Sequence, residues 1–157
     1  MADFQRIAYA TDFSPASLAA FPHALRLART TGAELTILHV LPSTLSPFIE
    51  GGYVPQEIWD QIDAGVRTQV GREMDRLITQ AVDVGVRATA SIVETGVPAE
   101  EIVRAAEAAK TDLLVLGTHG RTGVARLVLG SVAARVVATA ACPVLTVRAP
   151  EAAEARS

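Results

Sequence analysis

Short apolar runs alternate along this chain with longer segments in which apolar residues recur at helical spacing. Five runs rich in β-favouring residues predict strands at 6–11, 34–41, 86–93, 112–116 and 143–148. The segments between them predict four helices. One has Ser14 as its N-cap and Pro15 in its first turn, one covers most of 58–85, one opens at Pro98 and one occupies 131–141. Such alternation predicts an α/β fold, in which four helices cover both faces of one open, doubly wound sheet of five parallel strands.

Two of the predicted helices carry more specific expectations. Pro22 lies inside the first helix and predicts a kink, because proline removes a backbone donor and crowds the preceding turn. The long helix is expected to bury one stripe along its whole length. That stripe consists of Ile58, Ile62, Val66, Val70, Met74, Leu77 and Ala81.

No linker, repeat or low-complexity block divides the chain, so we expect one domain at 1–149 and a frayed tail at 150–157. The stretch 42–55 holds three prolines, two glycines and two serines and predicts a surface loop. Its length is unusual in a compact domain, which indicates a segment that is either mobile or functional.

Composition excludes several classes of function. A net charge of -3 disfavours a surface for nucleic acid, and the absence of a long apolar run disfavours a membrane span. Cys142 is the only cysteine, so the chain has no internal disulfide, and with three histidines it offers little for a structural zinc site. Together with a start that lacks a signal-peptide pattern, these features predict a cytoplasmic protein. For Cys142 itself, a packing role and redox sensing are both open.

The chemistry is expected in the glycine-rich loop that follows the apolar strand 112–116. There Gly117, two residues, Gly120, nine residues and Gly130–Ser131 lead into the helix at 131–141. Glycines allow positive φ and close approach of a ligand, and the free amides at a helix amino end bind oxyanions. Arg121 and Arg126 lie between the glycines as candidate counter-charges. This arrangement predicts a phosphate-binding loop built from main chain.

Two common nucleotide motifs do not fit. A P-loop ends in Gly-Lys-Ser/Thr, which is absent, and a dinucleotide fingerprint needs glycines after the first strand, where this chain has Thr11 and Asp12. Asp12 lies where ligands bind in such sheets and could hold ribose or a phosphate-bound metal, or simply cap a turn. His119 is open to two readings, a catalytic base or a polar loop residue.

The glycine spacing, with several strand ends, resembles the ATP-binding branch of the universal stress protein family. The resemblance covers roughly 3–148. The residues that carry it, besides the loop, are Thr11–Asp12 with Ser14, His39–Val40, Gly96 with Pro98, and Cys142–Pro143–Val144–Leu145. The chain departs from the family at Pro22 and in the Pro-rich segment before the long helix. The resemblance therefore does not assign the residues of the pocket's outer wall.

The resemblance implies a sheet of order 3-2-1-4-5, as in the adenine-nucleotide alpha-hydrolase-like fold, with ATP across its carboxyl edge. By position, Ala10, Thr11 and Asp12 would line the adenosine pocket and the backbone of Val40 would face adenine. The phosphate side would comprise Gly117, Thr118, His119, Gly120, Arg121, Gly130, Ser131 and Val132. Mg²⁺ or Mn²⁺ would be bound by the nucleotide phosphates, and Asp12 would contact the metal there.

The function expected from this resemblance is a nucleotide-dependent stress-response module with at most slow ATP hydrolysis, forming a homodimer through its last strand. That strand, Val144–Val147, is also an uncharged sheet edge, which favours pairing. Two alternatives stay open. One is a phosphohydrolase or nucleotidyl transferase using Asp12 and His119, and the other is an interaction module that does not use nucleotide.

Overall fold

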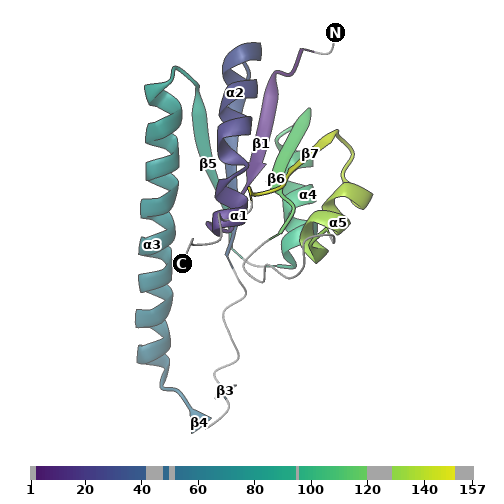
Figure 1. Ribbon diagram of the computed structural model, residues 1–157. Coiled ribbons are helices and arrows are strands. Elements are labelled where there is room, and N and C mark those ends of the chain that lie inside the picture. Colours follow the sequence, from purple (N-terminus) through teal and green to yellow (C-terminus); the bar gives the residue numbers. More distant parts are fainter. Residues whose placement is uncertain (1–2, 42–47, 50–51, 95, 120–128, 151–157) are drawn as a thin grey trace, which may run out of the picture.

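A computed structural model describes residues 3–41, 48–49, 52–94, 96–119 and 129–150, and its centre is a five-stranded parallel sheet (Figure 1). The spatial strand order is β5-β2-β1-β6-β7, which confirms the order expected from the resemblance. The strands are β1 (Arg6–Ala10), β2 (Glu34–Val40), β5 (Ala88–Val93), β6 (Leu113–Gly117) and β7 (Val144–Val147). The helices are α1 (Pro15–Leu18), α2 (Phe21–Thr31), α3 (Gln56–Asp83), α4 (Pro98–Ala108) and α5 (Ser131–Thr139).

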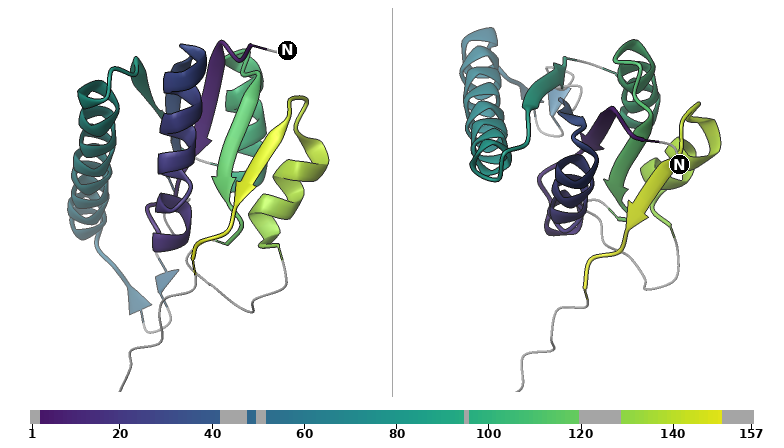
Figure 2. Two further views of the ribbon diagram at one scale, coloured as in Figure 1. Left: turned by 45° about the horizontal axis from the view of Figure 1, so that its top comes forward. Right: turned by 90° about the horizontal axis from the view of Figure 1, so that it is seen from above.

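Both faces of the sheet are covered by helices (Figure 2). Along β1, Ile7 and Tyr9 join the core on the side of α2 and α3, whereas Ala8 and Ala10 join the core on the side of α4 and α5. The same alternation divides β6, all of which is buried. Burial on both faces explains why these strands are continuous apolar runs.

The first predicted helix is divided in two where a kink was expected. Ser14 caps α1 as predicted, since its side chain accepts a hydrogen bond from the Ser17 amide at 3.2 Å. The chain then turns at Ala19 and Ala20, and α2 begins at Phe21. Pro22 consequently lies in the first turn of α2, where its missing N–H leaves no hydrogen bond unmade.

The long helix buries only part of its predicted stripe. Val70, Met74, Leu77 and Ala81 are buried in the core, but Ile58 and Ile62 are 47 % and 41 % exposed, contrary to the expectation. The reason is length, because a 28-residue helix spans about 42 Å and a six-residue strand about 20 Å. The amino-terminal half of α3 therefore runs past the sheet (Figure 1).

An exposed ion-pair cluster links the middle of α3 to the end of β5. The Arg67 guanidinium contacts the carboxylates of Glu94 and of Asp63, each at 2.8 Å. Exposed pairs of this kind contribute little to the free energy of unfolding, because solvent screens the charges.

The 42–55 stretch was predicted to be a surface loop, and it contains two short strands. β3 (Phe48–Ile49) and β4 (Gly52–Tyr53) pair antiparallel, with Phe48 opposite Tyr53. Residues 42–47 and 50–51 of that stretch, and the tail at 151–157, lie outside the described residues. Within the described part, no helix is both long and apolar enough to cross a bilayer.

Burial of Tyr9 generates a prediction about stability at high pH. The side chain is fully buried, its hydroxyl donates to the Ser17 carbonyl at 2.7 Å, and burial raises its pKa to about 12 from 10.0. The folded state thus favours neutral tyrosine. The contribution of the buried Tyr9 hydroxyl to the free energy of unfolding, about 3 kcal/mol, is complete below pH 10 and is lost between pH 10 and 12.

We expect the wild type to lose that stability relative to Tyr9→Phe across this window. The measurement is the urea unfolding free energy of both proteins from pH 8 upward, with tyrosinate absorbance followed in parallel. Equal pH dependence in the two proteins would contradict the assignment.

Candidate functional site

The carboxyl ends of β1, β2 and β6 bring most of the predicted site residues to one edge of the sheet. Ala10 pairs with Leu38 of β2 and Leu116 of β6, and the Thr11 amide donates to the Leu38 carbonyl at 2.9 Å. Val40 ends β2, and Gly117 ends β6. The structure therefore places the two expected halves of the site, at the ends of β1 and β6, on adjacent strands.

A tight turn follows β1 and fixes the Asp12 carboxylate. The Ser14 amide donates to Asp12 Oδ1 at 2.9 Å, and the Phe13 amide donates to Thr11 Oγ1 at 2.9 Å. Phe13 adopts φ 61, a left-handed conformation that is costly for an aromatic residue. Asp12 thus has the turn-capping role that the sequence allowed.

His39 supports the same turn from the neighbouring strand. Its side chain is buried, and Nδ1 lies 2.8 Å from the Thr11 carbonyl oxygen. Because a carbonyl oxygen only accepts, Nδ1 carries the proton in this contact. The imidazole also packs against the Phe13 ring, with centroids 4.6 Å apart. Sequence reasoning missed Phe13, since nothing in the pattern signals positive φ at a phenylalanine.

Gly117 is required by packing rather than by its backbone conformation. A Cβ atom built on it would lie 2.7 Å from the Ala16 carbonyl oxygen and 3.0 Å from Ser17 Cα. Its φ is not among the positive values in the described residues, although positive φ was one reason given for the loop glycines. The α1 backbone can approach β6 only because this residue has no side chain.

Gly130 shows the same kind of close contact at the start of α5. Its amide donates to the Thr118 carbonyl at 2.7 Å, and a Cβ atom would lie 2.8 Å from that oxygen. Gly130 occupies the N-cap position without a side-chain hydrogen bond, and the helix begins at Ser131. Ser131 is therefore the first helical residue, as the predicted range 131–141 had it. Ser131 and Val132 are both exposed.

Thr118 and His119 connect the end of β6 to the loop. The Thr118 amide donates to the Val147 carbonyl at 2.9 Å, and Thr118 Oγ1 lies 3.0 Å from His119 Nδ1. His119 Nε2 is buried, and within the described part of the chain it has no hydrogen-bond partner. Gly120, Arg121 and Arg126, all predicted near phosphate, lie outside the described residues.

A buried acid at the end of β5 escaped the sequence analysis. Gly96 has φ 140, and the Glu101 side chain occupies the space where a Cβ would be. Glu101 is buried in the first turns of α4 and pairs with Arg104 at 3.0 Å. An acid close after Gly-x-Pro was the available signal, because the amino end of a helix favours negative charge.

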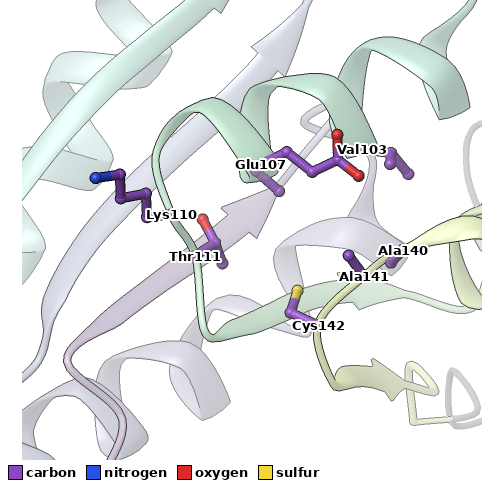
Figure 3. Close-up of a pocket in the computed structure, with 8 residues that line it drawn as sticks. Val103, Glu107, Lys110, Thr111, Ala140, Ala141 and Cys142 are labelled. Carbon is purple, nitrogen blue, oxygen red and sulfur yellow. The ribbon is translucent and has the colours of Figure 1, made fainter.

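A small cavity lies elsewhere, between the end of α4 and the segment joining α5 to β7 (Figure 3). Its volume is about 240 Å³, below the usual range of ligand pockets. It is lined by Val103, Ala106, Glu107, Lys110, Thr111, Ala140, Ala141 and Cys142. Burial raises the pKa of the Cys142 thiol, which disfavours the reactive thiolate and supports a packing role.

Comparison with known proteins shows which family this sequence matches. The model of the universal stress protein family matches residues 3–148. Universal stress protein MJ0531 of Methanocaldococcus jannaschii is 38 % identical over 94 % of this chain and 84 % of its own length.

Solved structures give the same result for the fold. The hypothetical protein MJ0577, also from M. jannaschii, has a TM-score of 0.80 and 28 % identity, covering 96 % of this chain and all of its own. A universal stress protein in complex with cAMP has a TM-score of 0.69 and 24 % identity, covering 95 % of this chain and all of its own.

The packing at Gly117 predicts that even a methyl group is harmful there. We expect Gly117→Ala to destabilise the fold by about 1–3 kcal/mol, because the Ala16–Ser17 backbone must move. Gly71→Ala is the matched control, since no atom lies within 4 Å of its Cβ position and alanine favours helix by about 1 kcal/mol. Urea unfolding measures both, and equal midpoints for the two variants would contradict the packing argument.

Proposed function

Because this chain belongs to the universal stress protein family, we propose that it binds ATP at the carboxyl edge of its sheet and acts as a nucleotide-dependent stress-response module. Binding is the proposed activity. Nucleotide occupancy would set the shape of the protein or its choice of partner.

The observation that carries the proposal is the amino end of α5, which has a glycine as its cap residue, beside the end of β6. The first intrahelical bond from the cap runs from the Ala134 amide to the Gly130 carbonyl at 2.8 Å. The amides of Ser131, Val132 and Ala133 precede it, and Gly130 has no side chain that could accept from them. Such amides, with the positive end of the helix dipole, suit a phosphate group.

The buried Nε2 atom of His119 supports the same assignment. A buried polar atom without a partner costs about 1–3 kcal/mol, and an anionic oxygen would remove that cost. If the Thr118 hydroxyl donates to Nδ1, Nε2 carries the ring proton and can donate to phosphate. His119 and Thr118 therefore fit the phosphate side of a nucleotide.

The adenosine end would lie at Ala10, Thr11, Asp12 and the Val40 backbone, at the ends of β1, which pairs with β6, and of β2 on its other side. A solved structure of this fold is a complex with cAMP, so the fold accommodates an adenine nucleotide. Within the described residues, no group of three or more His, Cys, Asp or Glu side chains could hold a metal. Mg²⁺ or Mn²⁺ would then be held mainly by the phosphates, with Asp12 as its protein contact.

Slow hydrolysis at most is consistent with the contacts of His119. Its ring nitrogen lies against the Thr118 hydroxyl, whereas a catalytic histidine is usually oriented by a carboxylate. The residues described at this edge supply positions for binding and charge, and we assign no residue a catalytic role.

A charge placed on α5 tests the phosphate assignment. We expect Ser131→Asp to lower ATP affinity at least tenfold, about 1.4 kcal/mol, because its carboxylate would repel phosphate. The same change should not harm the fold, because an acid in the first turn stabilises a helix by about 0.3–1 kcal/mol. Ser131→Asn is the neutral control and should stay close to wild type. Substituting Gly130 would be less clean, because any Cβ there meets the Thr118 carbonyl.

The measurement is calorimetric titration of ATP into protein freed of nucleotide, with Mg²⁺ present. The small molecule released by heating freshly purified protein identifies the natural ligand. Wild-type protein without saturable binding at millimolar ATP would refute the proposal. Equal affinities for the aspartate and asparagine variants would refute the position of the phosphates.

We also propose a homodimer through β7, the sheet edge next to β6. The Pro143 and Val147 carbonyls accept from β6, so by alternation the backbone N–H groups of Val144 and Thr146 face outward. An open edge of apolar residues without charge favours pairing with a second copy.

Proline on that edge tests the dimer. Thr146→Pro removes an outward N–H and leaves the β6 ladder intact, so we expect a folded monomer. Ala90→Pro is the matched control at the opposite edge, where the Arg87 and Val93 carbonyls pair with β2 and Ala90 faces outward. It should remain dimeric in sedimentation analysis. A dimeric Thr146→Pro protein would exclude this interface.

For location we propose the cytoplasm, on the basis of the single cysteine and its disfavoured thiolate. A protein partner that reads nucleotide occupancy is part of the proposal, and its identity is open.

A further inference from the structure

Buried polar side chains concentrate at one place in the fold. Among the described residues, five polar or charged side chains are buried, and four of them lie together where β1 meets α1. They are Thr11, Ser14, Ser17 and His39, each between 4 % and 6 % exposed. Concentration of buried polar groups at a ligand-facing edge is unusual, because a core is more simply filled with apolar residues.

The hydrogen bonds among these residues have a defined direction. Ser17 Oγ donates to the Ser14 carbonyl at 3.1 Å, which uses its only proton. With that proton on the Ser14 carbonyl, Thr11 is the donor in the 2.8 Å contact between Thr11 Oγ1 and Ser17 Oγ. Thr11 Oγ1 in turn accepts the Phe13 amide. The orientation of the turn after β1 thus depends on the Ser17 hydroxyl.

Ser17 also contacts the opposite half of the site through its backbone. The space in which Gly117 lacks a Cβ is bounded by Ser17 Cα and the Ala16 carbonyl. From the core side, the Tyr9 hydroxyl donates to the Ser17 carbonyl at 2.7 Å. One residue therefore meets the turn that carries Asp12 and the strand end that leads to Thr118 and His119.

We propose that Ser17 is a positioning residue that holds the adenosine half and the phosphate half of the nucleotide site at a fixed separation. This inference rests on the proposed function. A ligand that spans both halves gains from that fixed separation, whereas a ligand that occupies one half does not. The dependence on Ser17 should accordingly appear for ATP and be absent for its fragments.

Stability alone does not account for the arrangement. Replacing both partners of a buried hydrogen bond with apolar groups is often nearly neutral, so the fold could have used valine and alanine here. The hydroxyl pair instead fixes the orientation of Thr11 relative to Gly117, which apolar side chains would not do.

The experiment compares three probes on nucleotide-free wild type and Ser17→Ala by calorimetry. The probes are ATP, adenosine and inorganic tripolyphosphate. We expect Ser17→Ala to lose about tenfold in ATP affinity and to change less than about twofold for adenosine and for tripolyphosphate. A role in folding alone would not produce this difference between ATP and its fragments.

Two variants separate position from stability. Leu77→Ala leaves a cavity in the core at the carboxyl-terminal half of α3 and keeps the hydroxyl pair, so it should lower the unfolding midpoint and leave ATP affinity within about twofold. Ser17→Thr keeps the hydroxyl and should restore ATP affinity. If Ser17→Ala does not fold, Ser17→Cys keeps the side-chain volume and weakens the same hydrogen bond, so it must show a loss of the same kind, confined to ATP.

The inference is overturned if Ser17→Ala binds ATP as tightly as wild type, or if the affinities for ATP and its fragments fall by one common factor. Failure of the proposed function looks different, because wild-type protein would then show no saturable ATP binding, and the inference would fall with it.

Discussion

The site depends on one close backbone contact, in which the single turn of α1 rests on Gly117 at the end of β6. Because that glycine has no side chain, the Ala16 carbonyl and Ser17 Cα lie where a methyl group would be. The contact fixes the end of β1, through α1, against the end of β6. It also explains why the first glycine of the loop pattern is needed whether or not a ligand is bound. Gly117 and Gly130, the loop glycines that the structure describes, therefore serve packing in the first place.

Along β1, the buried residues within the sheet are apolar and stabilise the fold, whereas the polar residues of the candidate site follow the end of the strand. In β1, Ile7 and Tyr9 fill one core, and two residues later Thr11 continues the same side of the strand as a buried hydroxyl. Apolar burial on both faces holds the strand in place, so that the polar groups beyond its end need no flexible loop to position them. The helix amino end of α5 then adds donors that belong to the main chain and therefore require no particular side chain.

Much of the fold could be predicted because its determinants are local. Strands buried on both faces, such as β6, appear as unbroken apolar runs, and Ser14–Pro15 marks a helix start. The exposure of Ile58 and Ile62 could not be predicted, since it depends on where the neighbouring sheet stops and not on helix periodicity. At the candidate site, the strand ends and Gly130 were expected from the strand pattern, the glycine spacing and the family resemblance, whereas Ser17 and Phe13 were not. Their roles arise from contacts across the turn, which no linear pattern encodes.

The length of α3 has a consequence for how evenly this molecule is held together. Its carboxyl-terminal half is fastened to the core by Val70, Met74, Leu77 and Ala81, whereas in 56–65 only Trp59 is buried. Exposed ion pairs at Arg67 add little to that anchoring. The carboxyl-terminal half of α3 therefore unfolds only with the whole domain. The amino-terminal half unfolds locally, at a small cost in free energy. Backbone amides along α3 should accordingly exchange with solvent on two very different timescales.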